Sequence, residues 1–365
     1  MRLTLGDAQL ALNLFYSNAD LQRWLEGRSS EIIQEFSAVL ANRAALRALP
    51  LIAKIGPNGA KSKFDQSITT MVFGVFRATA IVQAGSKYPD QAKKLKNLAV
   101  VAAFFARSSA ANRAAAGAEV ARAAGAAAAC FSTPKITSSA AAAASAAHHA
   151  ARALVAAEVG SANSASFIWG PVSSDAQFLN QYADQDLAAV ALARCPLWLD
   201  GRPKWVESHW TNLKRALPED QKWEVWLSWY ENVLSGSDVG QEYDFVYADV
   251  ALEKFDEGVV PTNSFLSDRV SSIVSNTKLW DFFVSYANED ENAAREVVEV
   301  IESAGYTVVA QYKNFKPGAI FVREMERGLA ESGRFIAVQS QKYKNSDHCQ
   351  AEWAAAYNSD PGGKA

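Results

Sequence analysis

The chain has 365 residues, of which 49% are hydrophobic, which is enough apolar material for two or three globular domains. Its formal net charge is −3, and the segment from Lys278 onward, with 10 basic and 13 acidic residues, accounts for all of it. Bulk charge therefore argues against a nucleic-acid-binding protein and against a protein held on an anionic membrane by electrostatic attraction.

The cysteines and the N-terminal sequence indicate in which cellular compartment the protein is expected. The cysteines Cys130, Cys195 and Cys349 are odd in number and scattered, which predicts a reducing compartment without disulfides. The chain does not begin with a charged segment, an apolar run and a small-residue cleavage site, so we expect no secretion and a cytoplasmic location. The longest candidate span, residues 98–106, is too short for a bilayer, so we predict no transmembrane helix.

Residues 1–160 are predicted to form an alanine-rich helical domain. Residues 31–40 carry apolar side chains at helical spacing after Ser30, and Pro50 ends that helix. Residues 98–157 are dominated by alanine, the best helix former, whose small side chain lets helices approach closely. A packed helical bundle is one interpretation, and a disordered alanine tract is the other. His148 and His149 have no metal-ligand spacing to other residues, so we predict no metal site.

Residues 171–275 are predicted to form a second, tryptophan-rich helical domain. Pro203 and Pro218 are placed to begin helices, residues 258–263 are predicted to form a loop, and residues 275–277 a linker. The tryptophans cluster at positions that are compatible with helical spacing: Trp198, Trp205, Trp210, Trp223, Trp226 and Trp229. Two interpretations remain, core packing or an aromatic platform for a ligand or nucleotide bases.

Residues 278–365 show a strand–helix pattern that differs from the rest of the chain. Residues 280–286 are an apolar run without alternation, which is typical of a strand buried on both faces of a sheet. Further strands are predicted at 306–311 and 335–340. Helices are predicted after the cap at 288–290, after the turn at 315–318, and after Ser346 or Asp347, and Gly305 is placed as a left-handed C-cap. This order predicts a parallel sheet with right-handed crossovers.

The ends of these strands predict where a ligand binds. In open parallel sheets, ligands bind beyond the carboxyl ends of the strands. The loops 285–290, 313–318 and 339–349 follow the predicted strands. We therefore expect these three loops to converge on one site.

The same segment resembles the Toll/interleukin-1 receptor (TIR) domain of the bacterial type. The resemblance rests on the strand DFFVSYA at 281–287, on the turn Pro317-Gly318, and on the series Ser340, Tyr343, Ser346, Cys349, Glu352 and Trp353. It implies a flavodoxin-like fold behind a mostly helical N-terminal region. A whole domain of this kind carries two more strands and a final helix, so we expect this one to be incomplete at its C-terminus.

Many members of the family cleave NAD at the nicotinamide bond with a glutamate that matches Glu352. The chemistry is consistent with one carboxylate: nicotinamide in NAD is already a pyridinium cation, so it leaves neutral and needs no general acid. Glu352 would stabilise the positive charge that develops at the anomeric carbon, or attack that carbon transiently. The alternative is an ordinary acidic residue near the start of a helix, where the helix dipole favours it.

The resemblance implies a set of binding residues around this glutamate. Backbone groups of Ser285, Tyr286 and Ala287 would hold the carboxamide of nicotinamide, or these residues are a plain strand end. Phe315, at a loop tip, would cover the NAD or contact a partner, or it is exposed there by chance. Trp353 would stack on a ring or pack the helix on the sheet, and Cys349 is a cleft residue or, as we favour, a small buried hydrophobe. Asp290, Gly318 and Tyr343 complete the predicted site.

These expectations lead to three functional hypotheses. The first is an NAD glycohydrolase or cyclase, with NAD as substrate and no cofactor, whose helical region senses a signal and gates self-association of TIR domains. Bacterial TIR proteins in antiphage defence resemble this arrangement. The second is a non-catalytic TIR interaction module that docks through the Pro317-Gly318 turn. The third is a degraded fragment whose helical part has a separate role.

Overall fold

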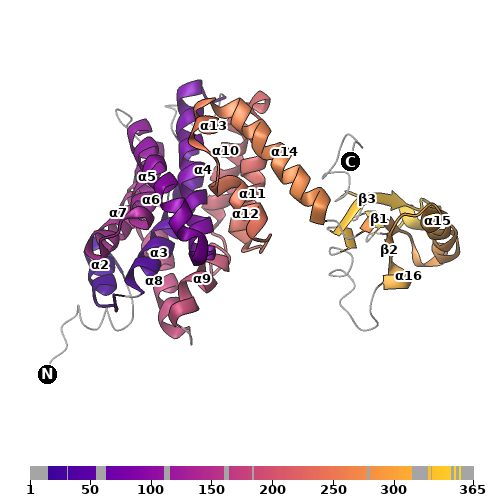
Figure 1. The fold of residues 1–365 in the computed structure, drawn as a ribbon, viewed down its shortest axis with the longest axis horizontal. Helices are drawn as coiled ribbons and strands as arrows, with labels where there is room; N and C mark the ends of the chain where they lie inside the picture. Colours follow the sequence, from indigo (N-terminus) through magenta and orange to yellow (C-terminus); the bar gives the residue numbers. More distant parts are fainter. Residues whose placement is uncertain are drawn as a thin grey trace. The chain divides into compact units, whose positions relative to one another are not determined.

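The computed structural model describes residues 15–30, 32–54, 63–110, 116–159, 164–182, 185–277, 280–314, 328–329, 331–346, 349–350 and 353–354. The chain divides into two compact units, Met1–Val270 and Ser271–Ala365. Figure 1 shows the helices of the first unit and the small sheet of the second.

The first unit is built from helices. They are α2 (Asn18–Glu26), α3 (Ile33–Ala48), η1 (Leu49–Lys54), α4 (Gln66–Lys87), η2 (Pro89–Gln91), α5 (Ala92–Ser109), α6 (Ala116–Ser132), α7 (Ile136–Ala156), α8 (Ser166–Gln181), α9 (Gln185–Arg194), α10 (Lys204–Ala216), η3 (Glu219–Gln221), α11 (Glu224–Ser235), α12 (Gln241–Ala248), α13 (Leu252–Asp256) and α14 (Val259–Thr277). The boundary with the second unit falls within α14.

The helix starts follow the sequence signals in some places and not in others. Pro203 and Pro218 directly precede α10 and η3, as predicted. The predicted loop at 258–263 and the predicted linker at 275–277 are wrong, because both lie within or at the start of α14. Pro261 is compatible with that helix since it falls in the first turn, where a missing N–H leaves no bond unmade.

The alanine-rich segment forms a packed bundle, so the prediction of packing is confirmed over the disordered alternative. In Figure 1, α5, α6 and α7 lie side by side, and α6 packs against both of its neighbours and against α3 and α4. Most alanines of α6 and α7 are buried. The approach of α6 to α4 depends on Gly85, where an added Cβ would lie 2.2 Å from Cζ of Phe131.

Two arginines and one aspartate are buried together in this unit. The carboxylate of Asp175 on α8 accepts hydrogen bonds from Arg43 Nε (3.0 Å) and from both terminal nitrogens of Arg47 (2.6 and 2.8 Å). The remaining donors bind backbone carbonyls in the segment 192–197. Burial alone would raise the pKa of Asp175, but the two guanidinium groups hold it below its ordinary value.

The tryptophan-rich helices share a core with the alanine-rich helices. The hydroxyl of Tyr230 on α11 donates to the carbonyl of Leu46 on α3 (2.9 Å), and the rings of Trp223 and Trp226 pack against Phe76 of α4. Residues of both predicted helical domains therefore lie within one compact unit.

Two helical segments of this unit pass a length and hydropathy test for membrane spans. They are Ile33–Lys54 and Gln66–Lys87, and 100% and 89% of their apolar windows are buried inside the structure. That burial is expected of core helices that pack against other helices, so they are weak evidence for a span.

The second unit is a parallel sheet, which confirms the predicted α/β class. Its elements are β1 (Trp280–Ser285), η4 (Asn288–Asp290), α15 (Glu291–Ser303), β2 (Val308–Ala310), α16 (Gln311–Asn314), β3 (Ser332–Ala337) and α18 (Gln341–Lys344). The strand order is β2-β1-β3, with β1 parallel to both neighbours (Figure 1). Gly305 adopts a φ of +87° after α15, as predicted.

Other predicted boundaries in this unit need correction. The third strand begins at Ser332 rather than at Phe335, and the short helix α18 was not predicted. Ser340 begins α18, because its hydroxyl accepts a hydrogen bond from the backbone N–H of Tyr343. The predicted helix after the turn at 315–318 lies mostly outside the described residues.

Candidate functional site

The strand order fixes where the topological switch point of the sheet lies. The chain passes from β1 to β2 on one side and then to β3 on the other side of β1, so the topological switch point lies between β1 and β3. Ligands bind at such points, beyond the carboxyl ends of the strands. In this unit those ends are Ser285 of β1 and Ala337 of β3, which are register partners.

A buried pair of hydroxyl groups lies at this edge. Oγ of Ser285 and the phenol oxygen of Tyr343 are 3.1 Å apart, and both residues are almost fully buried. The carbonyl of Ser285 accepts a hydrogen bond from the backbone N–H of Val338 (2.9 Å), just after β3. The end of β1 is therefore tied both to β3 and to α18.

A carboxylate lies beside this pair. The hydroxyl of Ser340 donates to Asp290 and also accepts from the backbone N–H of Tyr343 (3.0 Å). The N–H of Asp290 in turn donates to the carbonyl of Ala287 (2.7 Å). The loop after β1 and the loop after β3 thus contact each other through Asp290 and Ser340.

A further helical stretch begins after Ser346, at the cap that the sequence predicted. The hydroxyl of Ser346 accepts from the N–H of Cys349 (3.4 Å), and its carbonyl accepts from the N–H of Gln350 (3.0 Å). Residues 349–350 and 353–354 are helical. Cys349 is buried in a cluster with Ala287 and Tyr343, so this stretch packs against the edge of the sheet where β1 and β3 end.

Comparison with known families agrees with this architecture, since the family model described as the TIR domain matches residues 282–365. The C-terminal unit is a TIR domain. A long helical region precedes it, and no curated protein and no solved structure matches the chain. The presence of this domain supports a role in signalling or another function of TIR type.

Part of the predicted site of the TIR domain comes together in the structure. Ser285, Ala287, Tyr343 and Cys349 form one contiguous group, and Asp290 lies beside it. Cys349 is a buried side chain among apolar neighbours, which agrees with its interpretation as a small hydrophobe. Trp353 is 42% exposed.

Tyr286 belongs to a different group. It is buried with Ala294, Val298 and Val308, on the side of the sheet that α15 covers, and its hydroxyl accepts from the N–H of Tyr312 (3.0 Å). Burial raises the pKa of this phenol. The Tyr286 side chain therefore belongs to the core, and only its backbone is available for the predicted role.

Three predicted site residues, Phe315, Gly318 and Glu352, lie outside the described residues, as does the Pro317-Gly318 turn. Among the described residues, no group of three His, Cys, Asp or Glu side chains is arranged to hold a metal ion. His149 instead pairs with Glu119 (2.7 Å), which also binds Arg122 and Arg152. The part of the chain that the structure describes therefore brings hydroxyl groups and the carboxylate of Asp290 together where β1 and β3 end.

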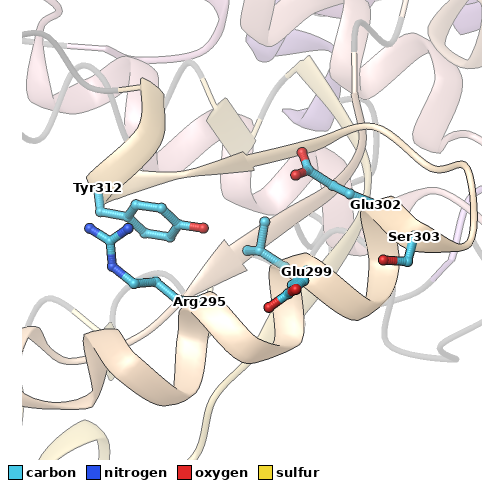
Figure 2. Close-up of a pocket in the computed structure, with 6 residues that line it drawn as sticks. Arg295, Glu299, Glu302, Ser303 and Tyr312 are labelled. Carbon is cyan, nitrogen blue, oxygen red and sulfur yellow. The ribbon is translucent and has the colours of Figure 1, made fainter.

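A surface depression in the TIR domain lies between α15 and α16, and Figure 2 shows its lining. The guanidinium of Arg295 lies over the ring of Tyr312, 4.0 Å from its centre, and also pairs with Glu291 (2.7 Å). Lys313 pairs with Glu302. The charged side chains that line this depression are largely paired with other side chains of the same unit. We therefore interpret the depression as a solvated surface rather than a ligand site.

The tryptophan cluster of the helical unit is core. Trp210, Trp223, Trp226 and Trp229 are among the largest fully buried side chains. The indole N–H of Trp226 donates to the buried amide oxygen of Asn263 (2.8 Å). A stacking platform requires exposed ring faces, so the core interpretation is confirmed and the platform is wrong for these four residues.

Proposed function

We propose that the TIR domain cleaves NAD at the bond between nicotinamide and ribose and releases ADP-ribose or a cyclic form. One observation carries this proposal: the helical stretch with Cys349 and Gln350 packs where β1 and β3 end. Glu352 follows three residues after Cys349, and residues at this spacing share one face of a helix. We therefore propose that Glu352 acts at the edge of the sheet where β1 and β3 end.

The chemistry needs few groups. Nicotinamide leaves as a neutral molecule, so one carboxylate that stabilises the developing oxocarbenium ion is sufficient. Backbone groups at residues 285–287 would bind the carboxamide of nicotinamide. Gly318, Phe315 and Trp353 would enclose the rest of the dinucleotide, and Asp290 would hold the two loops in place through Ser340.

The helical unit is proposed to detect a signal and to control assembly of the TIR domains, in signalling or in antiphage defence in the cytoplasm. TIR domains commonly self-associate. An active site that is completed only in an assembly would be silent at low protein concentration. Activity that rises more steeply than protein concentration would support this arrangement.

The test is release of nicotinamide from NAD by the full chain over a range of protein concentrations. We expect release by the natural sequence and a loss of about 100-fold or more in kcat for Glu352→Gln, because a group that stabilises transition-state charge is removed. Glu296→Gln, at an exposed glutamate of α15, is the matched control and should keep its activity. Equal release by Glu352→Gln, or none at any concentration, would contradict the proposal.

A non-catalytic interaction module is the second candidate, and exposed apolar side chains of the TIR domain favour it. Among the large apolar side chains that the structure describes in this domain, Val300 on α15 is the most exposed, at 71%. If NAD stays intact while sedimentation shows oligomers that Val300→Asp disperses, the interaction module is supported over the enzyme.

A further inference from the structure

Tyr343 makes contacts with several separate parts of the TIR domain. Its phenol oxygen lies 3.1 Å from Ser285 Oγ, and its backbone N–H donates to Ser340 Oγ. Its carbonyl accepts from the side-chain amide of Gln350 (3.2 Å), and its ring packs against Ala287 and Cys349. One residue thus touches the end of β1 and the helical stretch after Ser346.

Tyr343 joins Ser285, which belongs to the sheet, to the helical stretch with Gln350, which does not. Ser285 ends the central strand, which is hydrogen-bonded to β2 on one side and to β3 on the other. The stretch with Gln350 is not part of the sheet. It is held at its start by the cap at Ser346, by burial of Cys349, and by the bond from Gln350 to Tyr343.

The Ser285–Tyr343 bond is buried, and this gives it a larger influence than a surface bond. Ser285 and Tyr343 are 3% and 1% exposed, so the bond between them is shielded from water. A hydrogen bond in a medium of low dielectric is stronger than one in water, so this bond favours the arrangement shown over alternatives in which α18 shifts.

We propose that Tyr343, with Gln350, is a positioning residue that sets the helical stretch with Cys349 and Gln350, which directly precedes the proposed catalytic Glu352 in the sequence, against the end of β1. The proposal rests on the proposed function, since it concerns the same site. Tyr343 acts through Ser285 and Gln350, and its own side chain is 1% exposed. Because small displacements of a catalytic group lower turnover, loss of either bond should reduce kcat more than it changes KM.

The first test compares variants that remove one hydrogen bond each while keeping shape. Tyr343→Phe removes the bond to Ser285, and Gln350→Met removes the bond to the Tyr343 carbonyl. We expect kcat for nicotinamide release to fall by about 10-fold or more in each, with KM changed by less than about twofold. Tyr306→Phe, at a half-exposed tyrosine of the same domain, is the matched control and should keep kcat.

A double variant separates this role from general loosening of the fold. Ser285→Ala removes the other partner of the same bond. The double variant Tyr343→Phe/Ser285→Ala should therefore lose no more activity than the less active of the two single variants. Multiplied losses, unchanged kcat in Tyr343→Phe and Gln350→Met, or an equal loss in Tyr306→Phe would each overturn the proposal.

A second readout does not need activity. Cys349 is buried against Tyr343, and its alkylation by iodoacetamide, followed by peptide mass spectrometry, reports opening of this helix. Cys130, fully buried in the other unit, is the internal reference. We expect about 10-fold faster labelling of Cys349 in Tyr343→Phe and in Gln350→Met. Unchanged labelling overturns the positioning role; faster labelling without any NAD cleavage supports it and rejects only the proposed function.

Discussion

Asp281 and Thr307 bind each other across the entry to the sheet of the TIR domain. The carboxylate of Asp281, in β1, accepts from the backbone N–H (2.7 Å) and from the hydroxyl (2.8 Å) of Thr307, just before β2. The N–H of Asp281 donates back to the Thr307 hydroxyl (2.9 Å). These bonds fix the register of the two strands at their start, and hydrogen bonds from the Thr307 backbone and then its hydroxyl lower the pKa of Asp281.

The first prediction concerns the pH dependence of this pair. A carboxylate whose pKa is lower in the folded state contributes stability above its unfolded pKa of about 3.9, and this contribution is lost as pH falls through the folded value. Asp281→Asn should therefore speed amide hydrogen exchange in residues 281–285 at pH 7, with the difference from the natural sequence shrinking below about pH 4. Glu296→Gln, an equal change of charge on α15, is the control. A difference that stays constant with pH would contradict the role of the Asp281 charge.

The second prediction concerns the buried cluster of the helical unit. Asp175→Asn leaves two buried guanidinium groups without their counter-charge, so the free energy of unfolding should fall by about 3–5 kcal/mol. Glu219→Gln removes a carboxylate whose pair with Lys63 is solvent-exposed, and it should cost less than about 1 kcal/mol. Urea unfolding of both variants measures the difference. Similar costs would mean that the buried pairs add little beyond surface pairs.

The third prediction concerns the tryptophan core. Asn263 is fully buried, accepts from Trp226 Nε1 and donates to the carbonyl of Gln221 (2.8 Å). Trp226→Phe leaves the Asn263 oxygen unpaired and should lower the free energy of unfolding by about 2 kcal/mol or more.

The same substitution at Trp205 is the matched control for Trp226→Phe. Its indole N–H is buried and has no hydrogen-bond partner among the residues that the structure describes, so Trp205→Phe should cost much less. Urea unfolding again measures both. The interpretation fails if the two exchanges cost the same.

The fourth prediction concerns close packing of α4 and α6. An added Cβ at Gly85 would lie 2.2 Å from the ring of Phe131, so Gly85→Ala should destabilise the chain by about 1–3 kcal/mol through overpacking. Phe131→Leu replaces the ring with a smaller side chain. In that background, Gly85→Ala should lower the free energy of unfolding by clearly less. Equal costs in both backgrounds would show that the ring moves aside freely.

The fold of the TIR domain was predictable to a large extent because the spacing of apolar residues along the sequence indicates its strands and helices. The unalternating apolar run at 280–286 is typical of a strand buried on both faces, and it forms the central strand. The start of β3 could not be found this way, since Ser332, Gly333 and Arg334 are not an apolar run. They pair with β1 through backbone groups, which leave no trace in side-chain pattern.

The site was predictable only where a local signal existed. Ser285 and Ala287 could be named as strand-end residues, but neighbours on a strand alternate in direction, so Tyr286 turned to the other face. Ser340, which the predicted site left out, had the signature of a helix cap before Gln341. Gln350 had no signal at all, because its bond to the Tyr343 carbonyl depends on how two helices meet.

The arginine cluster has a consequence for the segment between α9 and α10. Cys195, Pro196 and Leu197 lie outside any helix or strand, yet their carbonyl oxygens are bound by the guanidinium groups of Arg43 and Arg47. A protease must draw an extended peptide into its cleft before it cuts. Limited digestion of the native chain should therefore spare this connection, although it resembles an ordinary surface loop.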